Sequence, residues 1–179
     1  MNKIKSKETL QENPSESIRK ATIEDIPEMA RINAECWKHN YKGIIAQNIL
    51  DAISVEEKKV RWTSNFEERQ KTAVMYVKEI DGKIAGFIGG SKNNDATVPY
   101  ENEITMVYVD VAQQGKKIGK ELFERLLEDE KFVHCASFFL RTLRDNMQSN
   151  SFYKKMGGKM FGYKEHKSGA MEVGYYRQK

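Results

Sequence analysis

The feature that most constrains the fold is an amphipathic helical segment between two apolar strands. Residues 103–110 (EITMVYVD) form the first strand. Residues 135–143 (CASFFLRTL) form a nearly continuous apolar run, which is typical of a strand at the centre of a sheet. The helix expected over about 117–130 places five apolar side chains on one face: Ile118, Leu122, Phe123, Leu126 and Leu127. These segments predict a strand–helix–strand unit at the heart of a mixed α/β sheet.

The remaining elements follow from hydrophobic periodicity and turn residues. Asp81-Gly82 joins two apolar strands and is the strongest short hairpin signal in the chain. Asp25 is the expected N-cap of the first helix, and Ser54 with Glu57 fits a capping box further on. The other predicted elements are strands over 18–22, 72–80, 83–92, 159–165 and 170–178, and helices over 24–41, 46–69 and 146–158.

Length and composition favour one soluble domain. The chain has 179 residues, of which 31% are charged and 39% hydrophobic, with a net charge of +4. We expect a leader over 1–17, which lacks hydrophobic periodicity, and a single domain over 18–179. No apolar stretch approaches the ~20 residues of a membrane span, and residues 1–17 show neither the apolar core nor the cleavage site of a secretory signal. We therefore expect a cytoplasmic protein without a membrane partner.

Two other kinds of site are not predicted. The three histidines show no metal-ligand spacing, and Cys36 and Cys135 lie far apart, so we expect reduced thiols and no metal. Lysine pairs such as Lys116-Lys117 lie on predicted helix surfaces, where they usually form solvated faces. A nucleic-acid partner is not expected, because no element combines clustered charge with interleaved aromatic residues.

The junction between the strand and the helix has the character of an anion site. A helix start presents unpaired backbone N–H groups, and Gly115 and Gly119 allow the backbone to approach a ligand closely. The spacing matches neither a Walker loop nor a dinucleotide fingerprint, so nucleotide hydrolysis is unsupported. Two glycines beside a helix start also occur in turns that merely connect elements.

This junction resembles the acetyl-CoA-binding motif of the GCN5-related N-acetyltransferase superfamily, Gln/Arg-x-x-Gly-x-Gly/Ala. The six positions are filled by Gln114, Gly115, Lys116, Lys117, Ile118 and Gly119, with lysine at the family's first glycine and Val111 at a frequent proline. Residues 141–158 are similar to the family's closing strand and helix through Asn146, Ser149, Phe152, Tyr153 and Gly157. The resemblance covers about 18–178 and implies the family fold, with about seven strands in a mostly antiparallel sheet and four or so helices.

The resemblance also implies how acetyl-CoA is held. Amides of the loop from Gln114 to Lys120 would bind the pyrophosphate, and Val107, Tyr108 and Val109 would pair with the pantetheine arm. The N–H of Val107 would meet the thioester carbonyl, where it stabilises a developing oxyanion. Asn146 would hold CoA, cap its helix, or do both. A lysine fits at position 117 if its φ is negative and its side chain points outward, where it would add charge near the phosphates.

Two residues are candidates for acid–base chemistry. Glu103, eleven positions before Gln114, matches a general base of histone-modifying relatives, and partial burial would raise its pKa. The alternative is a solvated residue at a loop end. Tyr153 matches a general acid that protonates the CoA thiolate, or it packs beside Phe152 on a buried helix face. Trp37 and Tyr41 lie four residues apart on one helical face. We expect them either to line a pocket for the acceptor or to pack in the core.

These features predict an N-acetyltransferase that moves an acetyl group to a primary amine of a small molecule or peptide, by direct transfer in a ternary complex. A non-catalytic CoA-binding sensor is the alternative, and Lys117 is the feature that favours it. We expect no covalent cysteine route, because neither Cys36 nor Cys135 falls beside the expected thioester site. The acceptor is not readable from the sequence. A positive chain argues mildly against a strongly cationic one, although the local charge of the cleft decides this, and a homodimer is left open.

Overall fold

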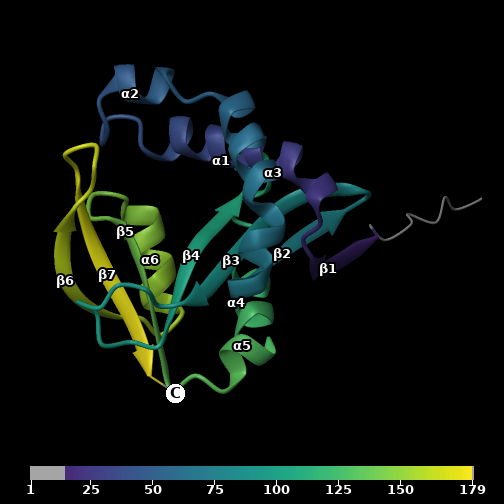
Figure 1. Cartoon of the computed structure of the whole chain (residues 1–179). Helices are drawn as coiled ribbons and strands as arrows, with labels where there is room; N and C mark the ends of the chain where they lie inside the picture. The colour runs from purple at the N-terminus through teal and green to yellow at the C-terminus, as the bar shows by residue number, and fades with distance from the viewer. Residues whose placement is uncertain (1–14, 179) are drawn as a thin grey trace, which may run out of the picture.

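The computed structural model describes residues 15–178, and within this range the chain forms one seven-stranded sheet flanked by helices (Figure 1). The strands lie in the order β1-β2-β3-β4-β5-β7-β6, and every neighbouring pair is antiparallel except β4 and β5. The strands are β1 (Glu16–Lys20), β2 (Ala73–Ile80), β3 (Lys83–Lys92), β4 (Asn102–Val109), β5 (Ser137–Leu143), β6 (Lys159–Glu165) and β7 (Met171–Gln178). The predicted mixed, mostly antiparallel sheet is confirmed.

The helices cover both faces of the sheet. They are α1 (Ile26–Asn40), α2 (Gln47–Asp51), α3 (Val55–Thr72), α4 (Ile118–Leu127), α5 (Glu130–Val133) and α6 (Met147–Lys155), with short 3₁₀ turns η1 (Ile23–Asp25) and η2 (Val111–Gln113). On one face, α1 packs Met29 and Ile32 against Phe87 of β3. On the other face, α4 and α6 cover a larger core that includes Leu122 and Tyr153. The helix predicted over 46–69 is divided into α2 and α3 by residues 52–54, and the short helix α5 is additional to the predicted ones.

The predicted strand–helix–strand unit is β4, α4 and β5. Its two strands are parallel but pair only at Asn102 with Phe138 and at Glu103 with Phe139. Beyond these pairs β4 and β5 separate, as the ribbon shows (Figure 1). The pairing of β4 with β3 contains a bulge at Thr105 of β4. Gly90 pairs with Ile104 and the adjacent Gly89 pairs with Met106, so Thr105 has no partner residue in β3. Such a bulge bends a strand, and here it lies where the two strands begin to diverge.

The predicted hairpin turn is confirmed, the predicted capping box shows one of its two hydrogen bonds, and Asp25 occupies the N-cap position of α1 without capping it. Asp81 and Gly82 both have positive φ, 50° and 75°, as the expected tight hairpin requires. Ser54 caps α3 by accepting a hydrogen bond from the Glu57 N–H. Asp25 directly precedes α1, but its side chain does not cap that helix. Its carboxylate instead accepts from Arg19 Nη1 at 2.7 Å and from the Thr22 N–H at 2.8 Å, so it is used in the turn before the helix.

The first strand begins at Glu16 rather than at residue 18, so the predicted leader is shorter by at least two residues. Residues 1–14 of that leader lie outside the described residues. Across residues 15–178, no helix combines the length and apolar character that crossing a membrane requires.

Candidate functional site

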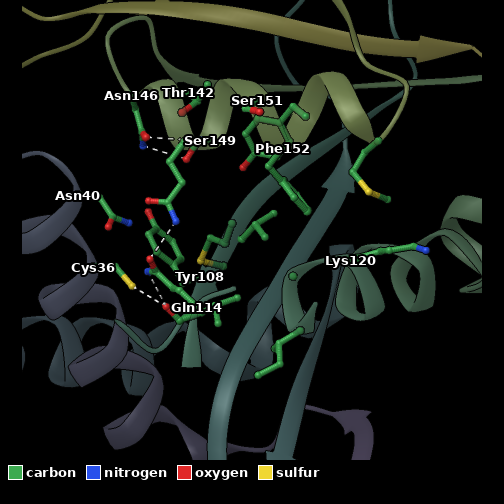
Figure 2. A pocket seen from close by; sticks show the side chains of 18 of the residues that line it. Cys36, Asn40, Tyr108, Gln114, Lys120, Thr142, Asn146, Ser149, Ser151 and Phe152 are labelled. Carbon is green, nitrogen blue, oxygen red and sulfur yellow. Dashed lines mark hydrogen bonds between the residues drawn. The ribbon is translucent and has the colours of Figure 1, made fainter. Parts of the chain in front are cut away.

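A pocket of about 590 Å³ lies where β4 and β5 separate. Its walls are β4, the loop before α4 and the first turn of α4, the end of β5, α6 and the C-terminal part of α1. Figure 2 shows Cys36 and Asn40 on the α1 side and Asn146 and Ser149 at the start of α6, whereas the Lys120 side chain extends along α4 away from them. Twelve predicted site residues line it: Tyr41, Val107, Tyr108, Val109, Gln114, Gly115, Lys117, Ile118, Gly119, Lys120, Asn146 and Tyr153.

The loop before α4 presents a run of unpaired backbone donors. Within residues 15–178, the N–H groups of the six residues from Gln114 to Gly119 make no hydrogen bond, whereas those of Gln113 and Lys120 are paired. Consecutive free N–H groups at a helix N-terminus form a concave site with positive potential, which favours an anion such as a phosphate. The predicted anion-binding role therefore has the donor arrangement that it needs.

The expectation for the backbone at Lys117 is wrong. Its φ is +66° with ψ 0°, so the lysine adopts the left-handed conformation at the N-cap of α4. Gly115, two residues earlier, has φ +81°. A left-handed conformation is accessible to glycine at low cost and costs an L-residue roughly 1–2 kcal/mol. This explains physically why glycine suits position 117, and shows that lysine there retains the loop shape at the expense of strain. The Lys117 side chain is exposed, as expected.

Gln114 ties this loop to the elements around it. Its Nε2 donates to the carbonyl of Val109 at 3.2 Å, and its Oε1 accepts from Gln148 Nε2 of α6 at 3.1 Å. The loop is thus attached to the end of β4 on one side and to α6 on the other (Figure 2). Asn146 caps α6, since its Oδ1 accepts from the Ser149 N–H at 3.2 Å, and it also lines the pocket.

The carbonyl of Val109 indicates how the free edge of β4 is oriented. It accepts from Gln114 and also from Cys36 Sγ at 3.1 Å, so it points away from β3. Backbone groups alternate in direction along a strand, and the N–H of Asp110 donates to β3 at the Ala85 carbonyl. Val107, two residues before Val109, therefore presents its N–H and carbonyl toward the pocket, on the edge that β5 leaves open.

Three tyrosines approach one another inside the pocket. Tyr153 is buried and packs its ring against Phe152, with centroids 5.3 Å apart. Burial raises the pKa of Tyr153 well above its ordinary value, and the nearby Tyr108 adds to the rise. Within residues 15–178 the Tyr153 hydroxyl makes no hydrogen bond, although the residue lines the pocket. Burial likewise raises the pKa of Tyr41, to which Tyr108 and Tyr153 contribute. These hydroxyls stay protonated at neutral pH.

Three predicted site residues do not line this pocket: Trp37, Lys116 and Glu103, which lies in a second pocket. Trp37 lies behind Tyr108 and donates from Nε1 to its hydroxyl at 3.0 Å, while its ring meets that of Tyr41 edge-on at 4.9 Å. Trp37 thus supports the wall that Tyr41 forms. Lys116 turns its side chain along the loop, with Nζ 2.8 Å from Gln113 Oε1, so only its backbone belongs to the anion site.

Glu103 lies in a second, adjoining pocket of about 620 Å³. The two pockets share Ile104, Thr105 and Arg141, which lie where β4 and β5 diverge. Burial raises the pKa of Glu103; Arg141 opposes the rise, and Asp95 adds to it. The sequence predicted a partly desolvated carboxylate here, and the direction of the pKa shift agrees with that prediction.

Charge is segregated between the two pockets. The first is lined by Lys117, Lys120, Arg141 and Lys155 and by no carboxylate. The second contains three carboxylates, those of Asp95, Glu103 and Glu172, together with Arg141 and Lys164. The first pocket therefore suits a polyanion and the second suits a cation.

Cys36 is closer to the site than the sequence indicated. It lines the first pocket, with Sγ 3.1 Å from the carbonyl of Val109, whereas the prediction that no cysteine falls beside the thioester concerns only one part of this pocket. Helix α1 places it there because its apolar face, including Met29, Ile32 and Cys36, covers β3 and β4. Burial raises the pKa of the Cys36 thiol to about 12, so it is not a thiolate at neutral pH. Cys135 lies elsewhere, with Sγ 3.0 Å from the Phe132 carbonyl.

Sequence reasoning also missed several residues that the fold brings to the two pockets: Asn40, Asp95, Arg141, Gln148, Lys164 and Glu172. Arg141 carried a usable signal, since it is the one charged residue within an otherwise apolar central strand. No group of three or more His, Cys, Asp or Glu side chains that could hold a metal ion is present in the described part of the chain.

Comparison with known proteins agrees with this geometry. Residues 28–158 match the Acetyltransferase (GNAT) family. A spermidine N(1)-acetyltransferase of Thermoplasma acidophilum is 26% identical over 149 residues, 80% of this chain and 88% of its own length. The uncharacterized N-acetyltransferase YuaI of Bacillus subtilis is 23% identical over 130 residues, 73% of each chain. Among solved structures, the PaiA N-acetyltransferase of T. acidophilum in complex with coenzyme A has a TM-score of 0.71 at 24% identity, covering 89% of this chain and 98% of that one.

The family match spans most of the chain and includes β4, the loop before α4 and α6, the elements that form the first pocket. The chain therefore belongs to the GNAT family of acetyltransferases and is an acyltransferase.

Proposed function

We propose that the protein transfers the acetyl group of acetyl-CoA to a primary amine of a small molecule or peptide, directly, within a ternary complex. The observation that carries the proposal is the pair of adjoining pockets with opposite charge. The first offers six unpaired backbone N–H groups to a phosphate-bearing molecule, and its lining includes lysines but no carboxylate. The second offers carboxylates to an amine, and the two meet at Thr105.

The residues of the first pocket would hold acetyl-CoA by groups that suit its parts. The N–H groups from Gln114 to Gly119 would bind the pyrophosphate, with Lys117 and Lys120 adding charge. The open edge of β4 would hydrogen-bond the pantetheine arm through Val107 and Val109, as an added strand does. This would place the thioester at the divergence of β4 and β5, beside both pockets.

Three groups would then perform the chemistry. Glu103 would take a proton from the ammonium form of the acceptor, so that the free amine can attack the carbonyl carbon. The N–H of Val107 would stabilise the negative charge that develops on the carbonyl oxygen. When the carbon–sulfur bond breaks, Tyr153 would donate its proton to the departing thiolate. The nitrogen would lose its second proton to solvent as the amide forms, and solvent would return a proton to Tyr153. Burial keeps Tyr153 protonated, so that it holds a proton to donate, and raises the pKa of Glu103, which makes that carboxylate a stronger base.

The direct route is favoured over a covalent one by the state of Cys36. Its thiol lies beside the pocket, but burial keeps it protonated, and no side chain among residues 15–178 is placed to take its proton, since its hydrogen-bond acceptor is the Val109 carbonyl. A thiol that cannot ionise is a poor nucleophile. The amine is therefore the nucleophile that attacks the thioester.

The test is steady-state kinetics of CoA thiol release with both acetyl-CoA and a primary amine varied. Direct transfer predicts intersecting double-reciprocal lines and no acetylated protein by mass spectrometry, with Cys36→Ser still active. Parallel lines with an acetyl group on the protein would contradict direct transfer. Acetyl-CoA binding without transfer to any amine in a broad screen would instead favour a CoA-binding sensor.

A further inference from the structure

The second pocket has an unusual charge balance for this chain. It holds the carboxylates of Asp95, Glu103 and Glu172 against the cations of Arg141 and Lys164, an excess of one negative charge. The chain as a whole has a net charge of +4, and the first pocket contains no carboxylate at all. A local excess of negative charge on a basic protein attracts a cationic ligand to that place.

Both cations of this pocket are already engaged by Asp95. Lys164 Nζ lies 3.4 Å from Asp95 Oδ2, and Arg141 Nη2 lies 3.9 Å from the same oxygen. The Arg141 guanidinium also lies against the rings of Phe139 and Phe161, at 5.8 and 5.4 Å from their centroids. Neither cation is therefore available as an unpaired partner for an anionic group of the acceptor.

Two carboxylates remain without a partner. Within residues 15–178, neither Glu103 nor Glu172 makes an ion pair or a side-chain hydrogen bond. Lys164 faces Glu172 in the β6–β7 register, yet its ammonium group reaches Asp95 instead. Both glutamates are partly buried, and the negative charge of Glu172 acts on Glu103 and on the Tyr41 hydroxyl. Glu172 thus lies near the reacting end of the cleft and close to the wall formed by Tyr41.

We propose that the acceptor carries two positive charges, as a diamine or polyamine does, with its reacting nitrogen at Glu103 and a second ammonium group paired with Glu172. This inference rests on the proposed function. Glu103 would accept the proton released by the reacting nitrogen, while the second nitrogen keeps its proton and its charge. Glu172 is then a specificity-determining residue: it binds the acceptor but takes no part in the transfer of the acetyl group.

Three acceptors with the same four-carbon chain test the proposal: 1,4-diaminobutane, n-butylamine and 4-aminobutanoate. They place an ammonium, a methyl and a carboxylate group at the far end. At saturating acetyl-CoA, kcat/KM for the diamine should exceed that for n-butylamine by about tenfold, which corresponds to ~1.4 kcal/mol for one partly exposed ion pair. The zwitterion 4-aminobutanoate should be the poorest acceptor, because its carboxylate would face Glu172.

The isosteric variant Glu172→Gln removes the charge. It should bring the ratio of kcat/KM for the diamine to kcat/KM for n-butylamine close to one. Glu165→Gln is the matched control, since Glu165 lies exposed on the same β6–β7 hairpin and lines neither pocket; it should keep the wild-type ratio. The wild-type preference should also shrink as salt is raised, because ions screen a partly exposed pair. The salt dependence of the wild-type protein tests the proposal even if Glu172→Gln does not fold.

The outcomes separate the two proposals. Equal use of the diamine and n-butylamine by the wild type, or a preference that survives in Glu172→Gln, would overturn the assignment of Glu172. A preference for 4-aminobutanoate would show that Arg141 or Lys164 binds a carboxylate, so the acceptor class would be wrong although acetyl transfer stands. No transfer to any of the three, by a protein that acetylates another amine in the broad screen, would overturn the acceptor assignment alone. No transfer in the broad screen either would refute the proposed function itself.

Discussion

Replacement of Lys117 by glycine should stabilise the protein, because a lysine there occupies a backbone conformation that favours glycine. Its φ is +66°, at the N-cap of α4. Relief of left-handed strain contributes roughly 1–2 kcal/mol. The greater freedom of glycine in the unfolded chain offsets about 0.5–1 kcal/mol of this gain. The expected net increase in the free energy of unfolding is therefore about 0.5–1 kcal/mol, which raises Tm by roughly 1–4 °C for a chain of this size.

A second variant separates backbone strain from loss of charge. Lys117→Ala removes the same ammonium group as Lys117→Gly but retains a Cβ and hence the strain. Thermal unfolding followed by circular dichroism should give a Tm close to wild type for Lys117→Ala and a higher one for Lys117→Gly. If the glycine variant proves less stable than the alanine variant, the left-handed conformation assigned to Lys117 is incorrect. The reasoning about why the loop tolerates lysine would then fail.

Three further predictions concern binding and chemistry. Gly119→Ala should weaken acetyl-CoA binding, because a methyl group would be added to the turn that is expected to approach the ligand. The variant should remain stable, since the methyl would lie at an ordinary 3.6 Å from Phe152 and Val109. Unchanged affinity by calorimetry would show that this turn does not contact acetyl-CoA. Tyr153→Phe should lower kcat by about 100-fold or more while the Kd for acetyl-CoA stays the same, and equal turnover would exclude an acid role. Because Glu103 must be ionised to act as a base and burial raises its pKa, kcat/KM should fall as pH drops through a value above the ordinary ~4.3 of glutamate. Glu103→Gln should have a lower kcat/KM at every pH, without this fall at low pH. If the fall persists in the variant, it is caused by another titrating group.

Local sequence patterns were sufficient to predict the elements that form the sheet and the loop with unpaired N–H groups before α4. The Asp81-Gly82 turn has the positive φ values that a tight hairpin needs, and a pair of residues determines this with little help from the rest of the chain. The strand–helix–strand unit follows from its apolar periodicity, which places Ile118 and Leu122 in the core. Helix geometry accounts for the unpaired N–H groups of Ile118 and Gly119 in the first turn of α4, whereas those of the preceding residues depend on the shape of the loop.

Features that depend on distant segments were not predictable in this way. The role of Asp25 is set by Arg19, whose guanidinium reaches it at 2.7 Å, so its carboxylate is unavailable as a cap for α1. The position of Cys36 depends on how α1 crosses the sheet. The second pocket draws Asp95, Arg141 and Glu172 from three separate parts of the chain, and no spacing in the sequence relates them.

The most direct test of the central claim is calorimetric titration of the purified protein with acetyl-CoA, with CoA and ATP as controls. The unpaired N–H groups and cationic lining of the first pocket predict micromolar binding, worth ~8 kcal/mol, of acetyl-CoA and CoA. ATP should bind much more weakly, because it lacks the pantetheine arm that the open edge of β4 would hold. Absence of binding to either CoA species, or equally tight binding of ATP, would contradict the account.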